Sequence, residues 1–220
     1  MIDFGSISIG IFALGRKSLS GVQPIGTTFA LDKAGYFATA HHVVGFDEKN
    51  LVLIFNLIPS IHDYQDTSDR DVHLLPAKLF ASDPFHDLAV LKVDIHLSSN
   101  IPISGTDSAL VGTQVTSFGF PHADHGRIVL TRQDTEIGAR VLINTGGIKA
   151  RHLVLNTQAR PGQSGSPIYR KDNGQLVAVL VGSYAPGGGS GITISGVDPN
   201  TLHQTTHAVS AEYLLKMYQP

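Results

Sequence analysis

The sequence contains no cysteine, carries almost no net charge and has no long apolar run. Without cysteine, the chain can build neither a disulfide framework nor a thiolate metal site. Its formal net charge is −2, and its basic residues are scattered singly. The sequence therefore offers no basic patch for a nucleic acid or an anionic membrane. No apolar stretch is long enough to span a bilayer, so we expect no membrane partner.

The N-terminus also lacks a targeting signal. Met1 to Gly5 contains no basic n-region and opens no long apolar h-region, so a signal peptide is not predicted. A chain without cysteine is compatible with a reducing compartment. Taking Met1 as the natural start, we expect a cytoplasmic protein.

The remaining composition is that of a globular β-rich protein. The chain has 220 residues, of which 42% are hydrophobic and 15% charged, enough for a substantial core. Polar and apolar residues alternate in Ser6 to Ile11, which predicts a first strand. The further predicted strands are Leu51 to Phe55, Leu74 to Phe80, Leu88 to Val93, Val115 to Phe118, Ile128 to Thr131, Leu153 to Leu155 and Leu176 to Val181. Short strands separated by glycine and proline indicate an antiparallel barrel or sandwich rather than βαβ units.

Two features interrupt this pattern. Near the end, Ser210 is a suitable N-cap for a helix over Ala211 to Tyr218. The stretch from His96 to Asp107 lacks periodicity and is the best candidate for a linker. We therefore expect two β-rich units, an N-terminal one over residues 1–98 and a C-terminal one over residues 108–220.

A serine between turn-forming residues is the first candidate for chemistry. Arg160 to Pro167 reads RPGQSGSP, with Ser164 directly before a glycine. A nucleophilic serine needs a base and backbone N–H groups aimed at the oxyanion it creates. Gly162 lets the backbone bend so that its own N–H and that of Ser164 converge. The segment alone does not exclude an ordinary Gly/Ser/Pro loop.

A histidine and a carboxylate precede the serine in the chain. His42 follows a β-rich segment directly, where a strand can hold a general base rigidly. Asp87 opens an apolar strand, and a buried carboxylate there needs a partner such as a histidine N–H. Each has an ordinary alternative, because the chain has 11 histidines and aspartate often caps a turn. The consistent order His42, Asp87, Ser164 is stronger than any one of them.

These segments resemble a known family. Thr39 to Val44, His86 to Leu91 and Gly162 to Pro167 are similar to the signature segments of trypsin-like (chymotrypsin-fold) serine proteases. Three further segments resemble the bacterial branch with the HtrA/Deg protease domains, namely Gly26 to Phe29 with Gly35 and Tyr36, Gly112 to Pro121, and Asn173 to Val179. Because the sequence stops after the predicted final helix, we expect no PDZ-like domain. The resemblance implies an all-β fold of two antiparallel six-stranded β-barrels and a C-terminal α-helix, with the active site between the barrels.

The resemblance also implies roles. It describes a serine endopeptidase in which Ser164 is the nucleophile, His42 the general base and Asp87 its orienter. The N–H groups of Gly162 and Ser164 would form the oxyanion hole, and His41 is the alternative base. The implied substrate is a protein or peptide, and no cofactor is needed. A homo-oligomer or a regulatory partner is left open.

Departures from the family pattern bear on activation and specificity. Gln163 stands where many digestive members have an aspartate that pairs with a freshly cleaved N-terminus, so we expect no activation of that kind. By the same resemblance, the specificity pocket would be lined by Thr157, Gln158, Ala159, Val181, Gly182 and Ser183. These residues carry no charge, which favours an apolar or small substrate side chain. A glycine-rich loop over residues 187–191 follows the pocket strand.

The sequence leaves two other interpretations open. His122, Asp124 and His125 could suggest a metal site, but such a loop is more often solvated, and no metal is predicted. The second interpretation of the whole chain is a protease-fold binding or regulatory module. In that case the oxyanion hole would stay inactive until a partner or an oligomer orders it.

Overall fold

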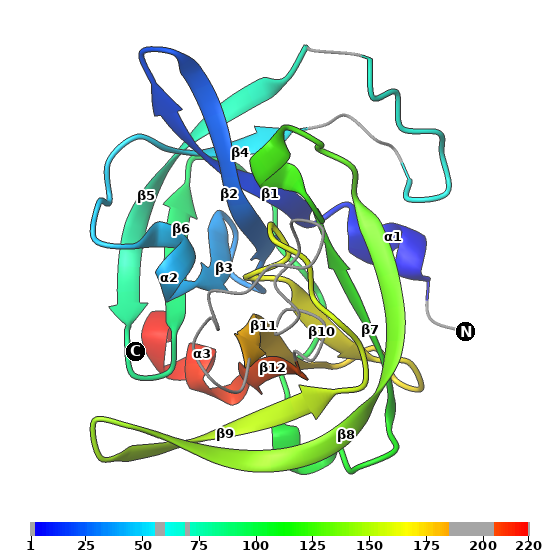
Figure 1. Ribbon diagram of the computed structural model, residues 1–220. Helices are drawn as coiled ribbons and strands as arrows, with labels where there is room; N and C mark the ends of the chain where they lie inside the picture. Colours follow the sequence, from blue (N-terminus) through cyan, green and yellow to red (C-terminus); the bar gives the residue numbers. More distant parts are fainter. Residues whose placement is uncertain (1–2, 56–59, 69–70, 185–204, 220) are drawn as a thin grey trace, which may run out of the picture.

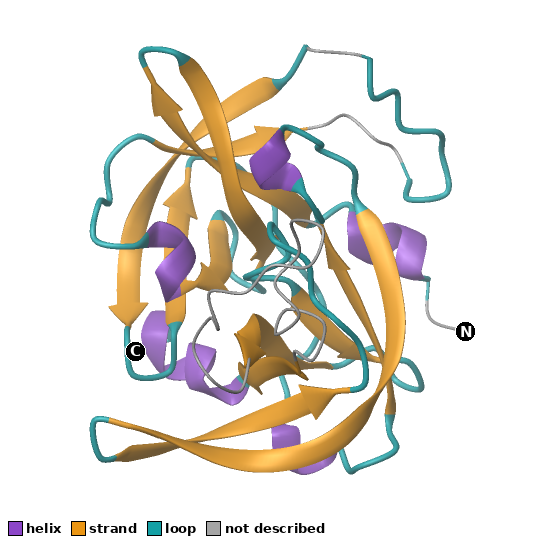
Figure 2. Cartoon of the chain, in the orientation of Figure 1, coloured by secondary structure: helices purple, strands orange, loops and turns teal. Residues whose placement is uncertain are grey.

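Two closed antiparallel barrels organise the chain (Figure 1). The computed structural model describes residues 3–55, 60–68, 71–184 and 205–219. Within these ranges, each barrel has six strands, and short helices lie at the edges (Figure 2). The predicted fold, two six-stranded barrels followed by a C-terminal helix, is confirmed. The glycine-rich loop over residues 187–191 lies outside the described residues.

The first barrel closes in the order β1-β2-β3-β6-β5-β4. Its strands are β1 (Ile11–Ser18), β2 (Gly21–Ala30), β3 (Tyr36–Ala40), β4 (Leu51–Phe55), β5 (His73–Asp83) and β6 (Leu88–Val93). The second barrel closes in the order β10-β11-β12-β9-β8-β7. Its strands are β7 (Gln114–Gly119), β8 (Thr131–Thr145), β9 (Ile148–Leu155), β10 (Pro167–Arg170), β11 (Leu176–Tyr184) and β12 (Thr205–Ser210).

Short helices connect and flank the barrels. They are α1 (Phe4–Ser8), α2 (His41–Val44), α3 (Glu212–Tyr218) and the 3₁₀ turns η1 (Thr106–Ser108) and η2 (Ala123–His125). None of the helices in the described ranges combines the length and the apolar character that crossing a membrane requires.

The first predicted strand is wrong. Residues Phe4–Ser8 form helix α1, and β1 begins only at Ile11. The reason is a cap, because Asp3 Oδ1 accepts the N–H of Gly5 at 2.9 Å and its other oxygen binds the Ser6 hydroxyl. An aspartate N-cap satisfies donors that a strand would leave unpaired here.

Two boundary predictions are also wrong. The predicted strand from Ile128 starts only at Thr131, where pairing with β7 begins. Ser210 does not cap α3, since it ends β12 and Ala211 takes the N-cap position. The Ser210 hydroxyl instead accepts the backbone N–H of Thr106 at 3.0 Å, in the connection between the barrels.

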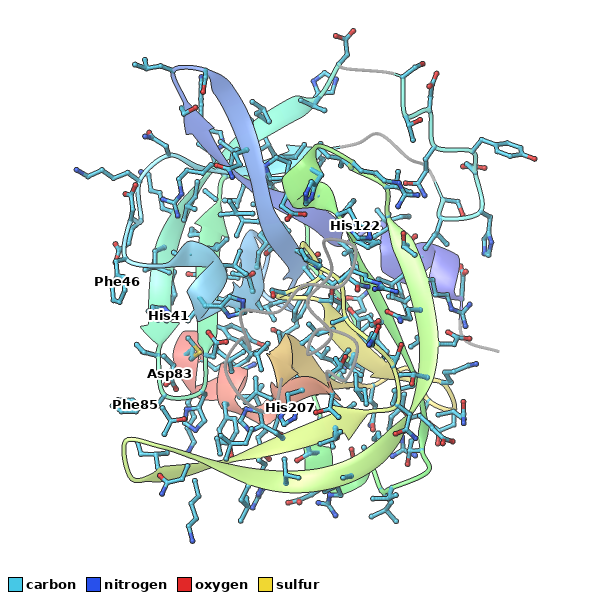
Figure 3. All side chains as sticks on the ribbon, in the orientation of Figure 1. His41, Phe46, Asp83, Phe85, His122 and His207 are labelled. Carbon is cyan, nitrogen blue, oxygen red and sulfur yellow. The ribbon has the colours of Figure 1, made fainter. Side chains whose placement is uncertain are left out.

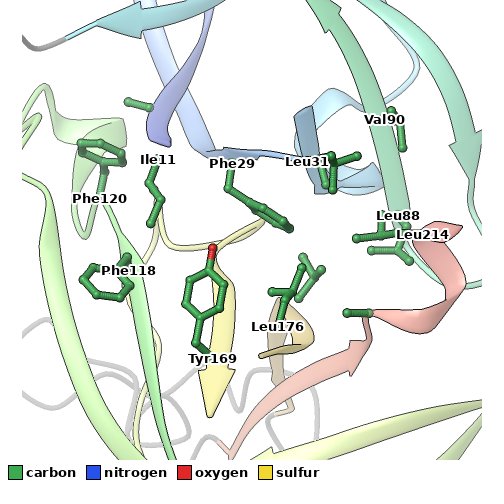
Figure 4. Packing of buried hydrophobic residues seen from close by; sticks show 14 of the residues in the cluster. Ile11, Phe29, Leu31, Leu88, Val90, Phe118, Phe120, Tyr169, Leu176 and Leu214 are labelled. Atoms are coloured by element: carbon green, nitrogen blue, oxygen red, sulfur yellow. The ribbon is translucent and has the colours of Figure 1, made fainter. Parts of the chain in front are cut away.

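An apolar core lies between the barrels as well as inside them (Figure 4). The residues that share this layer include Ile11, Phe29, Leu88, Phe118, Tyr169, Leu176 and Leu214. They come from both barrels and from α3, so removing this layer from water favours the assembled pair over separate barrels. Burial also raises the pKa of the Tyr169 phenol.

Helix α3 follows the second barrel in the chain but is fixed to the first. The Tyr218 hydroxyl donates to Asp32 Oδ1 at 2.7 Å, and Lys33 Nζ reaches the Tyr218 carbonyl at 3.4 Å. Burial and the Asp32 carboxylate raise the pKa of Tyr218. The helix therefore ties the end of the second barrel to the β2–β3 turn of the first.

Candidate active site

His42 and Asp87 form a two-point contact within the first barrel. Asp87 Oδ1 accepts the backbone N–H of His42 at 2.8 Å, and Oδ2 lies 2.7 Å from His42 Nδ1. An ionised carboxylate only accepts hydrogen bonds, so the proton of a neutral ring belongs on Nδ1. The Nε2 atom is then an acceptor, which is the form a general base needs.

The neighbouring histidine has a different partner. His41 Nδ1 lies 2.8 Å from the Ser82 hydroxyl on β5, and its backbone N–H donates to the Asp87 carbonyl at 3.0 Å. Figure 3 shows His41 at the start of α2, close to the end of β3. The imidazole that binds the Asp87 carboxylate is thus that of His42, which favours His42 over His41 as the base.

Ser164 is presented by two successive turns. Gln163 N donates to Arg160 O at 3.0 Å, and Ser166 N donates to Gln163 O, also at 3.0 Å. The third position of each turn is a glycine with positive φ, +90° at Gly162 and +86° at Gly165. This is the type II geometry, which accepts proline at its second position, as in Pro161, and requires glycine at its third. Ser164 occupies the second position of the second turn and is half-buried.

Thr27, on β2 of the first barrel, binds the two turns that present Ser164. The Thr27 amide donates to Ser164 O at 2.8 Å, and its hydroxyl donates to Gly162 O at 2.8 Å. Next to it, a Cβ at Gly26 would lie 2.6 Å from Val43 Cγ1 and 3.0 Å from Ser164 O. The missing side chain at Gly26 therefore lets α2 and the serine turn approach the same point of β2, which brings the segments of Ser164 and His42 together.

The amides of Gly162 and Ser164 are available to a substrate. Among the described residues, neither of these N–H groups donates to a protein acceptor. The same part of the chain shows no hydrogen bond between the Ser164 hydroxyl and His42. Such a bond often forms only in the complex with substrate. The described part of the chain thus leaves the N–H groups of Gly162 and Ser164 without a protein acceptor, and Asp87 orients the His42 imidazole.

The packing of Gly165 leads to a testable prediction. A Cβ there would lie 2.1 Å from Thr27 O and 2.4 Å from Thr39 Oγ1. We expect Gly165→Ala to lower the free energy of unfolding by about 3 kcal/mol or more through overpacking and backbone strain. The matched control is Gly112→Ala, which has φ +84° but open space. Its expected cost is about 1 kcal/mol. Urea denaturation measures the unfolding free energy of both variants. If Gly165→Ala and Gly112→Ala lose the same amount, packing at Gly165 is unimportant.

The predicted pocket segments meet across β12. Thr206 donates its hydroxyl to Thr157 O at 2.6 Å and accepts the Ala159 N–H at 2.8 Å. On β11, Ser183 pairs with the same Thr206. The backbones of the predicted wall segments 157–159 and 181–183 are thus joined through one residue of β12. Sequence reasoning missed Thr206, which lies 49 residues from Thr157.

Gln163 is part of a buried network. It is only 2% exposed, and its Oε1 accepts the Arg160 N–H at 2.7 Å. Its Nε2 donates to Gln133 Oε1 at 3.2 Å, and Gln133 Nε2 in turn donates to the Thr157 hydroxyl. The amide side chain thus links the serine turn to the predicted pocket wall, and within the described residues its partners are uncharged. The role of Gln133 was not predicted.

Two histidines that the sequence did not single out lie near the site. His207, labelled in Figure 3, pairs with Gly182 across β11 and β12. His152 on β9 pairs with Val209 on β12. Burial lowers the pKa of both imidazoles, and the proximity of His207 lowers that of His152 further. Both are therefore neutral at pH 7, and neither adds positive charge to the predicted pocket.

The loop considered for a metal is not assembled as a ligand cluster. His125 Nδ1 pairs with Asp124 Oδ1 at 3.1 Å, while the rings of His122 and His125 are 6.5 Å apart. Across the described ranges, no group of three or more His, Cys, Asp or Glu side chains could hold an ion.

Two barrels with this constellation between them define the class of trypsin-like proteases. Comparison with known proteins gives the family directly. The family model for the trypsin-like peptidase domain matches residues 26–179, and the chain belongs to that family. This confirms the predicted resemblance and the predicted class, a serine protease hydrolase.

Curated relatives are named as bacterial serine proteases. The chain is 28% identical over 171 residues to a probable periplasmic serine endoprotease DegP-like from Pseudomonas fulva. It is 27% identical over 175 residues to a protein of the same name from Bartonella henselae. These matches cover 76% and 77% of this chain but 31% and 30% of the relatives. The chain thus spans about a third of their length.

Solved structures support the fold. The MamO protease domain from Magnetospirillum magneticum superposes with a TM-score of 0.67 at 15% identity, covering 99% of this chain and all of that one. The HtrA-type protease AlgW with a tripeptide gives a TM-score of 0.65 at 20% identity, covering 96% of this chain and 59% of that one.

The comparisons correct the expected compartment. The relatives from Pseudomonas and Bartonella are named as periplasmic. The cytoplasmic location expected from Met1 to Gly5 is therefore wrong. The lack of a basic n-region and an apolar h-region in Met1 to Gly5 does not decide the compartment.

Proposed function

We propose that this chain hydrolyses peptide bonds through a Ser-His-Asp triad and an acyl-enzyme. His42 Nε2 takes the proton of the Ser164 hydroxyl as its oxygen attacks the scissile carbonyl. The N–H groups of Gly162 and Ser164 stabilise the oxyanion. His42 then protonates the leaving amine, and water repeats the cycle on the ester. The substrate is a protein or peptide, and the protein acts in the periplasm, as the names of its relatives suggest.

The contact between His42 and Asp87 carries this proposal. A histidine whose Nδ1 lies 2.7 Å from a carboxylate, with its backbone N–H on the other oxygen, is fixed in ring orientation and tautomer. The type II turn at Gly162 adds support, because its φ of +90° is available to glycine at little cost. Of the two proposed units, residues 1–98 supply His42 and Asp87, and residues 108–220 supply Ser164.

The proposed specificity follows from the walls that Thr206 connects. Thr157, Gln158, Ala159, Val181, Gly182 and Ser183 present no charged side chain, and the adjacent His207 is neutral at pH 7. We propose that the pocket takes an apolar or small side chain. A homo-oligomer or a regulatory partner remains a prediction.

Labelling with a fluorophosphonate tests the nucleophile. We expect the probe to react with the wild type and the adduct to map to Ser164 by mass spectrometry, because the hydroxyl is activated only there. Ser164→Ala should abolish labelling. Ser166→Ala is the matched control, since Ser166 is fully buried two residues away, and it should label as the wild type does. Equal labelling of the wild type and Ser164→Ala would exclude Ser164.

The same experiment distinguishes the second interpretation. A folded wild type that reacts with no active-site probe, yet binds a peptide tightly, would be a protease-fold binding module. In that case the oxyanion donors would be ordered only by a partner or an oligomer.

A further inference from the structure

A second aspartate–histidine pair lies immediately before Asp87. Asp83 Oδ1 accepts the backbone N–H groups of Phe85 at 3.1 Å and His86 at 3.2 Å. Asp83 Oδ2 lies 2.6 Å from His86 Nδ1. The side chains of His86 and Asp83 are only 16% and 27% exposed. One carboxylate therefore closes the turn that joins β5 to β6, as aspartate does at the start of many turns.

The ring of His86 leaves this turn and packs on α3. It stacks on Tyr213 with centroids 3.9 Å apart and an interplanar angle of 29°. Figure 3 shows Asp83 and Phe85 next to this helix, drawn in red. The stack joins a turn of the first barrel to a helix that follows the second.

Tyr213 is itself anchored to the second barrel. Its hydroxyl accepts the backbone N–H of Arg151 on β9 at 3.0 Å. The Arg151 guanidinium pairs with Glu212 at 2.9 Å and with Asp107 at 2.8 Å. A continuous series of contacts thus runs from β9 through α3 to His86.

Asp87 is the residue next to His86, and its backbone needs support. Its φ is +54°, a left-handed conformation that is uncommon for residues other than glycine. Such a conformation persists where the surrounding structure determines it. The surrounding structure here is the His41 N–H, which binds the Asp87 carbonyl, and the turn that Asp83 closes and His86 connects to α3. Both carboxylate oxygens of Asp87 hold His42, so a rotation of this backbone would move the imidazole.

We propose that His86 is a positioning residue for Asp87. Through the Asp83 pair and the Tyr213 stack, α3 sets the geometry of the contact between Asp87 and His42. That contact lies within the first barrel, yet its alignment depends on the second. For its catalytic consequence, this inference rests on the proposed function. The alternative is that the stack only adds stability.

Kinetics of variants on α3 separate these possibilities. We expect Tyr213→Leu, which removes the stacked ring, to lower kcat about tenfold with KM unchanged, because misalignment affects the chemical step rather than binding. His86→Ala should do the same. Tyr213→Phe keeps the stacked ring, and Arg151 still pairs with Glu212 on α3, so kcat should stay within about twofold of the wild type. All rates are measured well below the unfolding temperature of the least stable variant.

The control is a second tyrosine on the same helix. Tyr218→Phe removes the hydrogen bond to Asp32 and should lower the Tm, but it does not touch His86. It should leave kcat unchanged. An equal loss of kcat in Tyr218→Phe and Tyr213→Leu would mean that the stack acts through stability alone. Wild-type kcat in both Tyr213→Leu and His86→Ala would also overturn the proposal.

A spectroscopic readout does not depend on turnover. In a Ser164→Ala background, the proton between His42 Nδ1 and Asp87 should give a downfield NMR signal. We expect Tyr213→Leu and His86→Ala to shift or broaden this signal, and Tyr218→Phe to leave it unchanged. If the wild type neither labels nor hydrolyses peptides, the proposed function fails, yet this signal still decides the coupling. An unchanged signal in both Tyr213→Leu and His86→Ala would overturn the proposed coupling between α3 and the contact of Asp87 with His42.

Discussion

Replacing Ser164 with alanine is expected to lower peptide hydrolysis by about 10⁶-fold while the protein stays folded. The loss is large because the remaining groups can then only bind substrate and stabilise an oxyanion that no protein nucleophile creates. The substitution removes one hydroxyl from a half-buried position, and that hydroxyl makes no hydrogen bond to His42 in the described part of the chain. The measurement is the initial rate of cleavage of an unstructured peptide library, with thermal unfolding measured in parallel.

The control for this prediction lies two residues away. Ser166 is fully buried. Its hydroxyl lies so close to Gly119 that a Cβ added to Gly119 would be 2.1 Å from Ser166 Oγ. Ser166→Ala should therefore retain the wild-type rate, because its hydroxyl faces the interior of the fold. Activity of Ser164→Ala within tenfold of the wild type, at matched stability, would disprove a serine mechanism at this position.

Replacing Asp87 with asparagine should lower kcat by about 10⁴-fold at neutral pH. The reason lies in the two hydrogen bonds that Asp87 accepts from His42, at the backbone N–H and at Nδ1. An asparagine can accept at only one of these positions. With its oxygen on the backbone N–H, its NH₂ group faces Nδ1, which moves the ring proton to Nε2. A ring protonated at Nε2 cannot accept the serine proton.

Asp83→Asn is the comparison for this result. Asp83 lies four residues earlier and pairs with His86, so its loss should be about tenfold at most. The measurement is the ratio of the losses in the two variants, taken from steady-state rates and from fluorophosphonate labelling rates. If Asp87→Asn loses no more than Asp83→Asn, the two carboxylates are equivalent, and Asp87 is not the orienter of the base.

Local patterns predicted much of the fold. Strands β4 and β6 begin and end where their apolar runs do, because these runs are buried on the barrel wall and flanked by turn residues. The alternation in Ser6 to Ile11 failed, since periodicity in a short window does not outweigh an aspartate cap. Ser210 failed for the opposite reason, because its hydroxyl serves a contact with Thr106 that the sequence cannot display.

The residues of the candidate site likewise fall into those that the sequence could predict and those that it could not. Residues inside short motifs, such as His42, Asp87 and Ser164, could be nominated from the sequence because each motif is local. Thr206 and Gln133 could not, since they act through hydrogen bonds to residues 49 and 30 positions away. Their side chains look ordinary in the sequence, and only the closure of the second barrel brings them to the serine turn and the pocket wall.

The hydroxyl of Thr27 has a consequence for folding. It binds the Gly162 carbonyl across a separation of 135 residues, and contacts of such range form late because much chain must be ordered first. The turn that presents Ser164 is therefore expected to reach its final shape only after both barrels have come together. A nascent or half-folded chain would carry the residues of the proposed triad without their final arrangement. Under the proposed function, this long-range hydrogen bond would delay proteolytic activity until folding is complete.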